Sequence, residues 1–121
     1  MPRFVNKTAT IPAGQALSNA VDCSTGMPVF VYLPATWMPA TLSFQVSPDG
    51  TNFSDLFTAE SREIMLNVAA GTAVRLDQAW EPVTYLKVRS GSRHNVVPQD
   101  SNQLITIVLD TAASMAVTSS K

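Results

Sequence analysis

The chain has 121 residues, the size of one ordinary domain, so a two-domain enzyme is close to excluded. Hydrophobic residues make up 45% and the formal net charge is −1, which excludes global disorder because disorder needs low hydrophobicity and high net charge together. Charged residues make up only 14%, against about 25% in typical proteins, so we expect uncharged polar residues or a partner to cover much of the surface.

Strand-forming runs follow one another along the whole chain. Stretches rich in Val, Ile, Thr, Phe and Tyr recur between clusters of Pro, Gly, Asn, Asp and Ser, and helical periodicity is nearly absent. Nine short strands in one small domain imply two packed sheets, so we predict an all-β antiparallel β-sandwich, jelly-roll-like in form. The predicted strands cover residues 4–10, 16–22, 29–33, 41–47, 54–57, 64–68, 73–76, 85–90 and 104–109.

The strongest local pattern is a strand followed by a turn. Apolar and polar residues alternate over 42–47, which predicts a half-buried strand. Asp49 and Gly50 then supply a tight turn, since glycine adopts the left-handed conformation without steric cost. We expect a hairpin in which Phe53 and Phe57 return to the core side.

The two ends of the chain differ from the middle in composition. Residues 1–12 carry a few apolar positions but end at a proline, and residues 110–121 are an Ala, Ser, Thr and Met stretch without a strong period. Ends of this kind are disordered unless another chain orders them. We therefore predict an extended N-terminal arm over 1–12, a β-sandwich domain over 13–109 and a C-terminal tail over 110–121.

Groups suited to catalysis are few. Cys23 is the single cysteine, which excludes an intramolecular disulfide and zinc sites with several thiolates, and it is interpreted either as a nucleophile or as a small buried hydrophobe. His94 is the single histidine and lies in a polar loop, while Glu60 and Glu63 form the nearest carboxylate pair. No phosphate loop, nucleophile elbow or metalloprotease motif occurs, so we expect no enzyme activity, cofactor or metal.

The charge pattern gives little support for nucleic-acid or membrane partners. The basic residues are scattered, and a near-neutral chain lacks the clustered Lys and Arg that neutralise phosphates. Lys87 and Arg89 share one strand face, which we interpret as a solvated sheet surface. No apolar run approaches the roughly 18 residues of a membrane span, and the first residues lack a signal-peptide core, so we expect synthesis in the cytoplasm.

Two tryptophans lie near strand ends. Trp37 stands between Pro34 and Pro39, which hold a loop extended, and Trp80 lies in a polar connector. Each indole suits either of two uses: closing an end of the sandwich, or stacking on a sugar ring or a partner side chain.

Four stretches of the chain resemble a family of small virion proteins of tailed phages and prophages, found among head-gene products. The stretches are residues 9–22, 33–37, 42–53 and 85–91, and they depart from the family at residues 23–26, where a glycine-rich turn is expected. The resemblance implies a β-sandwich or jelly-roll component of the virion. The role we prefer is a capsid decoration, or cement, protein that binds the outside of the major capsid protein shell.

A cement role needs a rigid domain, a weakly charged contact surface and ends that become ordered on contact. We expect the arm and tail to contact the shell or a neighbouring copy, the protein to form a homotrimer, and deletion of residues 1–12 to abolish shell binding without unfolding the domain. The expected partner-binding residues are Arg3, Phe4, Val5, Ile11, Trp37, Trp80, Met115 and Val117.

The sequence is also compatible with two other functions. One is a tail, neck or fibre-attachment component of the same virion, which composition does not distinguish from a shell protein. The other is a glycan-binding β-sandwich module that uses Trp37 and Trp80 as stacking platforms.

Overall fold

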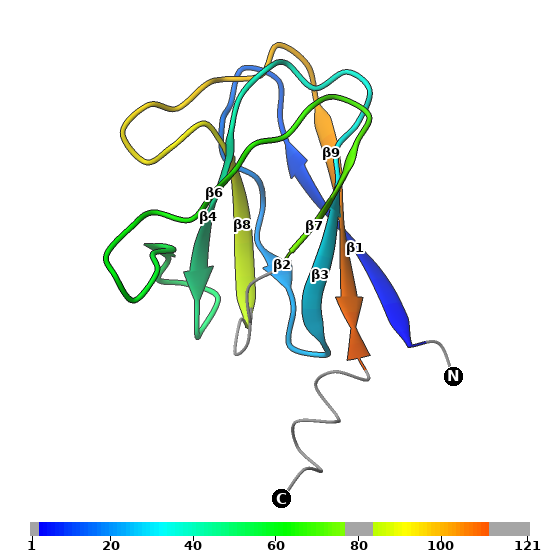
Figure 1. Ribbon diagram of the computed structural model, residues 1–121, viewed down its shortest axis with the longest axis vertical. Helices are drawn as coiled ribbons and strands as arrows, with labels where there is room; N and C mark the ends of the chain where they lie inside the picture. Colours follow the sequence, from blue (N-terminus) through cyan, green and yellow to red (C-terminus); the bar gives the residue numbers. More distant parts are fainter. Residues whose placement is uncertain (1–2, 77–83, 112–121) are drawn as a thin grey trace, which may run out of the picture.

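The structure is a computed structural model that describes residues 3–76 and 84–111. In these ranges the chain forms nine β-strands and no α-helix (Figure 1). The strands are β1 (Phe4–Ile11), β2 (Val21–Asp22), β3 (Met27–Tyr32), β4 (Leu42–Ser47), β5 (Ser54–Asp55), β6 (Met65–Leu66), β7 (Ala73–Arg75), β8 (Tyr85–Ser90) and β9 (Gln103–Asp110).

The strands form two antiparallel sheets that pack face to face. Sheet A has the order β1-β9-β3-β7, and sheet B has the order β2-β8-β4-β5, with β6 also paired to β4. Figure 1 shows the long strands of both sheets running along the long axis of the molecule. The predicted all-β antiparallel sandwich is therefore confirmed.

The core lies between the sheets and is built by period-two alternation. One side chain in two on each long strand points inward, so successive residues face the core and the solvent in turn. Sheet A contributes Ile105, Ile107 and Leu109 from β9, and sheet B contributes Leu42 and Phe44 from β4; all five are fully buried.

The strand predicted over residues 4–10 is confirmed, but its assignment to an N-terminal arm outside the sandwich is wrong for residues 4–11. These residues form β1, which pairs with β9 along its whole length, and Ala9 and Ile11 are fully buried in the core. Composition was misleading because a strand with one solvent-facing side needs an apolar residue only at every second position. The sandwich therefore begins at β1 and extends to Asp110 at the end of β9; residues 112–121 of the predicted tail lie outside the described residues.

The hairpin after β4 confirms the turn but not the expected faces of the phenylalanines. Gly50 has φ of 79°, and the Asp49 carboxylate accepts backbone N–H groups from Thr51 and Asn52, which hold the pKa of Asp49 far below its usual range. Leu56 packs against the core instead of Phe53 and Phe57. These two rings are half-buried beneath cations: the Lys87 ammonium lies 4.5 Å from the ring centre of Phe53, and the Arg93 guanidinium 5.2 Å from that of Phe57.

Several strands are shorter than predicted. The stretch 16–22 pairs regularly only at β2, with an isolated bridge from Leu17 to Arg89, and the stretches 54–57 and 64–68 are reduced to β5 and β6. Between β5 and β6 the chain leaves the sheet edge, with one isolated bridge joining Phe57 to Glu63. Propensity marked these residues as strand formers, but the bends in the chain leave too little room for longer pairing.

Candidate interaction surface

The outer face of sheet A carries exposed apolar and aromatic side chains. Phe4, Tyr32 and Leu104 are 51%, 46% and 56% exposed, which is unusual for large hydrophobic residues on three neighbouring strands. They come from β1, β3 and β9, each at the positions that alternate with core residues. The face that should be the solvated one therefore remains partly apolar.

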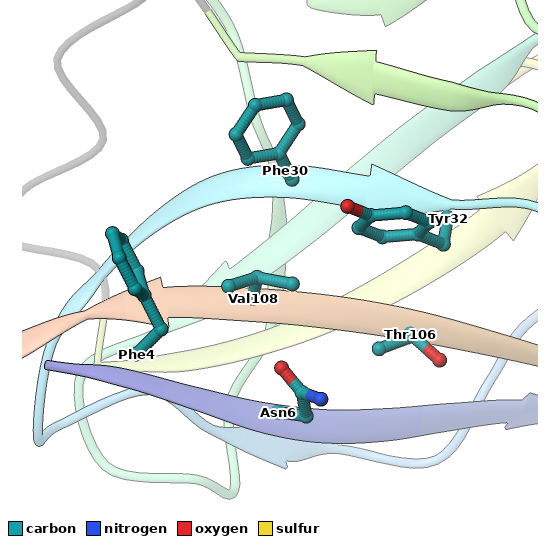
Figure 2. Close-up of a pocket in the computed structure, with 6 residues that line it drawn as sticks. All are labelled: Phe4, Asn6, Phe30, Tyr32, Thr106 and Val108. Atoms are coloured by element: carbon teal, nitrogen blue, oxygen red, sulfur yellow. The ribbon is translucent and has the colours of Figure 1, made fainter. Parts of the chain in front are cut away.

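Strand register gathers six of the outward residues around a shallow hollow (Figure 2). Val108 on the central strand lies opposite Asn6 on one side and Phe30 on the other, and Thr106 lies opposite Tyr32. The hollow has a volume of about 460 Å³, and Phe4 closes the end near the chain terminus.

The lining of this hollow suits binding better than chemistry. It contains three aromatic rings, one isopropyl group, one amide and two hydroxyl groups, those of a tyrosine and a threonine. It contains no carboxylate, imidazole or thiol. Such a mixture provides apolar contact area with a few groups that fix orientation by hydrogen bonds. The residues that line it are Phe4, Asn6, Phe30, Tyr32, Thr106 and Val108.

Cations border two of the three aromatic rings. The Arg3 guanidinium lies 5.2 Å from the ring centre of Phe4 and forms an ion pair with Asp110, with Nε 3.0 Å from Oδ1. Arg75 lies 5.9 Å from the ring centre of Phe30. The rings present their edges and free faces to solvent between these charges, in the pattern of an apolar contact patch with a polar rim.

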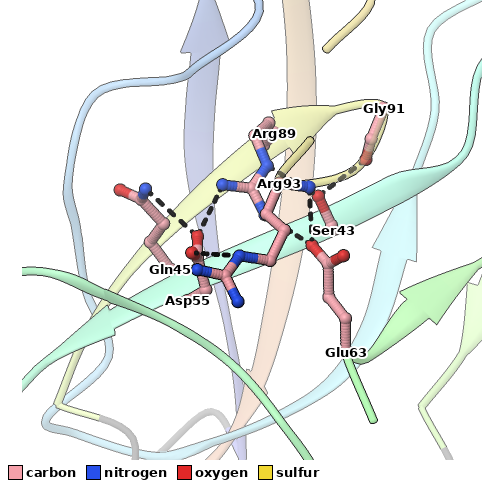
Figure 3. A network of polar contacts seen from close by, with 7 residues as sticks. All are labelled: Ser43, Gln45, Asp55, Glu63, Arg89, Gly91 and Arg93. Atoms are coloured by element: carbon pink, nitrogen blue, oxygen red, sulfur yellow. Dashed lines mark hydrogen bonds and ion pairs between the residues drawn. The ribbon is translucent and has the colours of Figure 1, made fainter. Parts of the chain in front are cut away.

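The outer face of sheet B is closed by a network of polar contacts (Figure 3). The Arg89 side chain is only 6% exposed, and its Nη1 and Nη2 donate to Asp55 and Glu63 at 2.6 Å each. Its Nε donates to the Ser43 hydroxyl at 2.9 Å, and that hydroxyl donates to the carbonyl of Gly91 at 2.6 Å. The interpretation of Arg89 as part of a solvated face is therefore wrong, because the chain around Asp55 and Glu63 covers it.

The remaining members of this network complete its charge balance. Arg93 lies 3.2 Å from the second oxygen of Asp55, and the Gln45 amide donates to the first oxygen at 3.4 Å. The hydrogen bond from Arg89 is the largest cause that lowers the pKa of Asp55. Two cations and two carboxylates are thus paired with one another, so the network fastens the segment between β5 and β6 to the sheet and leaves no unpaired charge for a ligand.

The single cysteine and the single histidine lie in different environments. Cys23 is buried, and its burial raises the pKa of the thiol to about 11, so the sulfur is protonated near neutral pH. This favours the interpretation of Cys23 as a buried hydrophobe. His94 is exposed in the loop after β8. Among the residues that the structure describes, no group of three or more His, Cys, Asp or Glu side chains could hold a metal ion.

The predicted partner-binding residues divide into three sets. Phe4 lines the hollow, Arg3 lies beside the Phe4 ring, and Val5 is half-buried on the alternate side of β1. Ile11 is fully buried and Trp37 is 4% exposed, so neither can contact a partner. Trp80, Met115 and Val117 lie outside the described residues.

Trp37 is buried because the chain turns back over the end of the core. Its backbone N–H donates to the Pro34 carbonyl at 3.2 Å, and its indole N–H donates to the Ala40 carbonyl at 3.4 Å. Trp37 thus closes one end of the sandwich, which is one of the two uses expected for it. A glycan platform on this indole is ruled out by its burial.

The sequence did not identify Tyr32, Leu104 and Val108 as surface residues. Their strands are almost wholly apolar, and the sequence of such a strand does not show which side chains face the core. The signal that could have found Leu104 and Val108 is the alternation of β9, where Ile105, Ile107 and Leu109 leave the even-numbered residues outward.

The comparisons with known proteins give no relative: no family model and no curated protein matches this chain. Within the described ranges no helix is long and apolar enough to span a membrane.

Proposed function

We propose that this protein is a structural component of a phage virion that binds the outside of the major capsid shell and stabilises it by bridging neighbouring subunits. The observation that carries the proposal is the exposed aromatic face of sheet A on a rigid, weakly charged sandwich. The resemblance of residues 9–22, 33–37, 42–53 and 85–91 to small virion proteins supports the setting.

The face of sheet A has the properties that shell binding needs. Tyr32 and Phe4 are aromatic anchors that bring large contact area at low cost in conformational entropy, and Leu104 extends the patch along β9. Asn6 and Thr106 lie between them and offer hydrogen bonds that fix the orientation of the contact. Each contact is modest, but repetition around a closed shell multiplies its effect.

Because β1 is part of sheet A, the N-terminal residues would contact the shell as part of a sheet and not as a separate arm. Arg3 and Phe4 do not belong to an arm that becomes ordered on contact; they are part of a sheet whose geometry is already set. A preformed surface binds without the entropic cost of ordering a segment. In the described part of the chain, shell contact therefore uses a rigid face.

A tail, neck or fibre-attachment component would use the same kind of surface, so the number of copies per particle separates these roles. We propose quantitative gel analysis of particles purified from the bacterium that carries the gene. A molar ratio to the major capsid protein of the same order as one is expected for a cement protein. A ratio fitting a single ring of subunits, or absence from particles, would contradict the proposed role.

The hollow also favours a second candidate, a glycan-binding module, because Tyr32 lies opposite the hydroxyl of Thr106 and the amide of Asn6 lines the same hollow from β1. Titration with bacterial surface polysaccharides, followed by NMR of the Asn6 and Thr106 amides, tests it. Saturable shifts at these amides would favour the module, and their absence would leave the shell as the partner.

A further inference from the structure

One edge of sheet A exposes main-chain hydrogen-bonding groups. β1 pairs with β9 on one side, and among the strands that the structure describes none pairs with its other side. The Thr111 N–H donates to the Arg3 carbonyl at 2.8 Å, and in an antiparallel ladder this places the odd-numbered residues of β1 in the hydrogen-bonded pairs with β9. The even-numbered residues then direct their N–H and C=O groups outward.

Thr10 confirms this parity and marks where the free edge ends. Its N–H donates to the Asn19 side-chain oxygen at 2.8 Å, and its carbonyl accepts the Asn19 N–H at 3.3 Å. Phe4, Asn6 and Thr8 keep their outward groups without a protein partner in the described chain. At the other end, Pro2 in the sequence has no N–H to donate. The free stretch is therefore centred on Asn6.

This edge has only one of the features by which sheet edges usually avoid pairing, the charged residue Lys7. Proteins protect edges with short strands, bulges, prolines and charged side chains, lysines above all. β1 pairs over eight residues without a register shift, and the side chains of Phe4, Asn6 and Thr8 carry no charge. The opposite edge of the same sheet, β7, has only three residues and ends in Arg75. β1 is thus the edge of sheet A that is suited to accept another strand.

We propose that two copies of this chain pair β1 with β1 in antiparallel orientation, with Asn6 opposite Asn6 of the second copy. In this register Phe4 faces Thr8 of the second copy and the reverse, so every outward N–H and C=O of the three residues is used. Lys7, the one charged residue between Phe4 and Thr8, alternates with them and faces the other side.

The pairing joins two copies of sheet A into one continuous sheet and places both hollows on one face. The contact is self-complementary, which gives a closed two-fold dimer, whereas the trimer expected from sequence would need two different patches to meet. The inference concerns the edge of the sheet and does not depend on what covers its face.

Analytical ultracentrifugation of the full chain at micromolar concentrations tests the oligomeric state. A concentration-dependent monomer–dimer equilibrium is expected. A chain that stays monomeric throughout, or that forms trimers, would overturn the inference.

Substitutions at Asn6 test the register. Asn6→Asp keeps the shape of the side chain, and both Asn6→Asp and Asn6→Lys place like charges opposite each other at the two-fold axis. Each is expected to raise the dimer dissociation constant about fivefold or more, and an equimolar mixture of the two variants is expected to restore dimers. Dimers unaffected by either variant, or a mixture that dimerises no better than the single variants, would refute the register.

Thr106→Lys is the matched control, because Thr106 lines the same hollow but lies on β9, one strand in from the free edge. Its dimer is expected to be as strong as that of the unmodified chain. If this variant abolishes dimers while the Asn6 variants keep them, the face and not the edge joins the copies.

Discussion

The fold buries the Arg89 side chain, and we expect its replacement to lower the free energy of unfolding. Arg89→Met keeps most of the apolar stem but leaves Asp55 and Glu63 beside each other without their shared partner. Because removing one member of a buried ion pair leaves uncompensated charge, we expect a loss of about 3 kcal/mol in unfolding free energy, measured by urea denaturation.

Arg93→Met is the control for this prediction. Arg93 contacts the same Asp55 but its side chain is 43% exposed, so its loss should cost less than about 1 kcal/mol. If the two variants lost equal stability, the buried position of Arg89 would not be the source of the effect.

Asp55 makes the same network sensitive to acid. The hydrogen bond from Arg89 lowers the pKa of Asp55 from its usual value of 3.8, so its contribution to stability is complete above that value and is lost as pH falls through the lower folded-state pKa. The unmodified chain should therefore lose more unfolding free energy between about pH 6 and about pH 2.5 than Asp55→Asn does. Parallel pH profiles of the two proteins in urea would contradict this assignment.

Local chemistry was predictable from single residues, whereas long-range burial was not. The turn at Asp49 and Gly50 follows from the conformations these two residues favour, and it is present as predicted. The burial of Arg89 depends on Glu63, which lies 26 positions away and reaches it only through the folded topology. Trp37 had two possible uses because a proline-flanked indole can serve as an end cap or as a stacking platform.

At the scale of elements, β1 was predicted as a strand over 4–10 but was wrongly assigned to an arm outside the sandwich. Deleting residues 1–12 removes β1, which is the partner of β9 on one side. The deletion also removes Ala9 and Ile11 from the core and exposes the residues they cover. We now expect the truncated chain to lose its cooperative unfolding transition and its near-ultraviolet circular dichroism signal, in contrast to the intact domain expected from sequence. A truncated chain with the unfolding midpoint of the full chain would show that β1 is dispensable.

The turn that follows β8 depends on a glycine. Gly91 has φ of 95°, and an added Cβ would meet the carbonyl oxygen of Asn95 and lie 2.9 Å from the Cα of Val96. We expect Gly91→Ala to cost about 3 kcal/mol or more in unfolding free energy, measured by thermal and urea denaturation.

Gly14→Ala separates backbone strain from steric conflict in this prediction. Gly14 has φ of 80°, but an added Cβ would meet no atom within 4 Å. Its substitution should cost only about 1 kcal/mol, the strain of a left-handed residue alone. Similar losses for the two alanine variants would mean that the crowding at Gly91 relaxes without cost.

Alternation explains which elements the sequence could predict. Strands β4 and β8 follow it closely and appear with nearly the expected bounds. The expected strand at 16–22 was too long, because the chain there pairs with β8 only at β2 and at the bridge of Leu17. The interaction surface was not predictable because it depends on register, which brings Asn6, Val108 and Phe30 into one row.

At the scale of the whole molecule, the two outer faces have opposite characters. Sheet B is closed by paired charges around Arg89, while sheet A exposes Phe4 and Tyr32 at an open hollow and Leu104 farther along β9. A protein with this asymmetry can lie on a large surface through one side and leave the other in solvent. Low overall charge allows that approach without strong repulsion or attraction at long range.

Binding through one face is tested by two variants on opposite sides of the sandwich. Tyr32 is 46% exposed on sheet A and Met65 is 49% exposed on sheet B, so Tyr32→Lys and Met65→Lys make comparable changes at comparable exposure. The measurement is the molar ratio of each variant to the major capsid protein in purified particles. Tyr32→Lys should lower this ratio about tenfold or more, whereas Met65→Lys should leave it unchanged. Equal ratios for the two variants would contradict binding through sheet A.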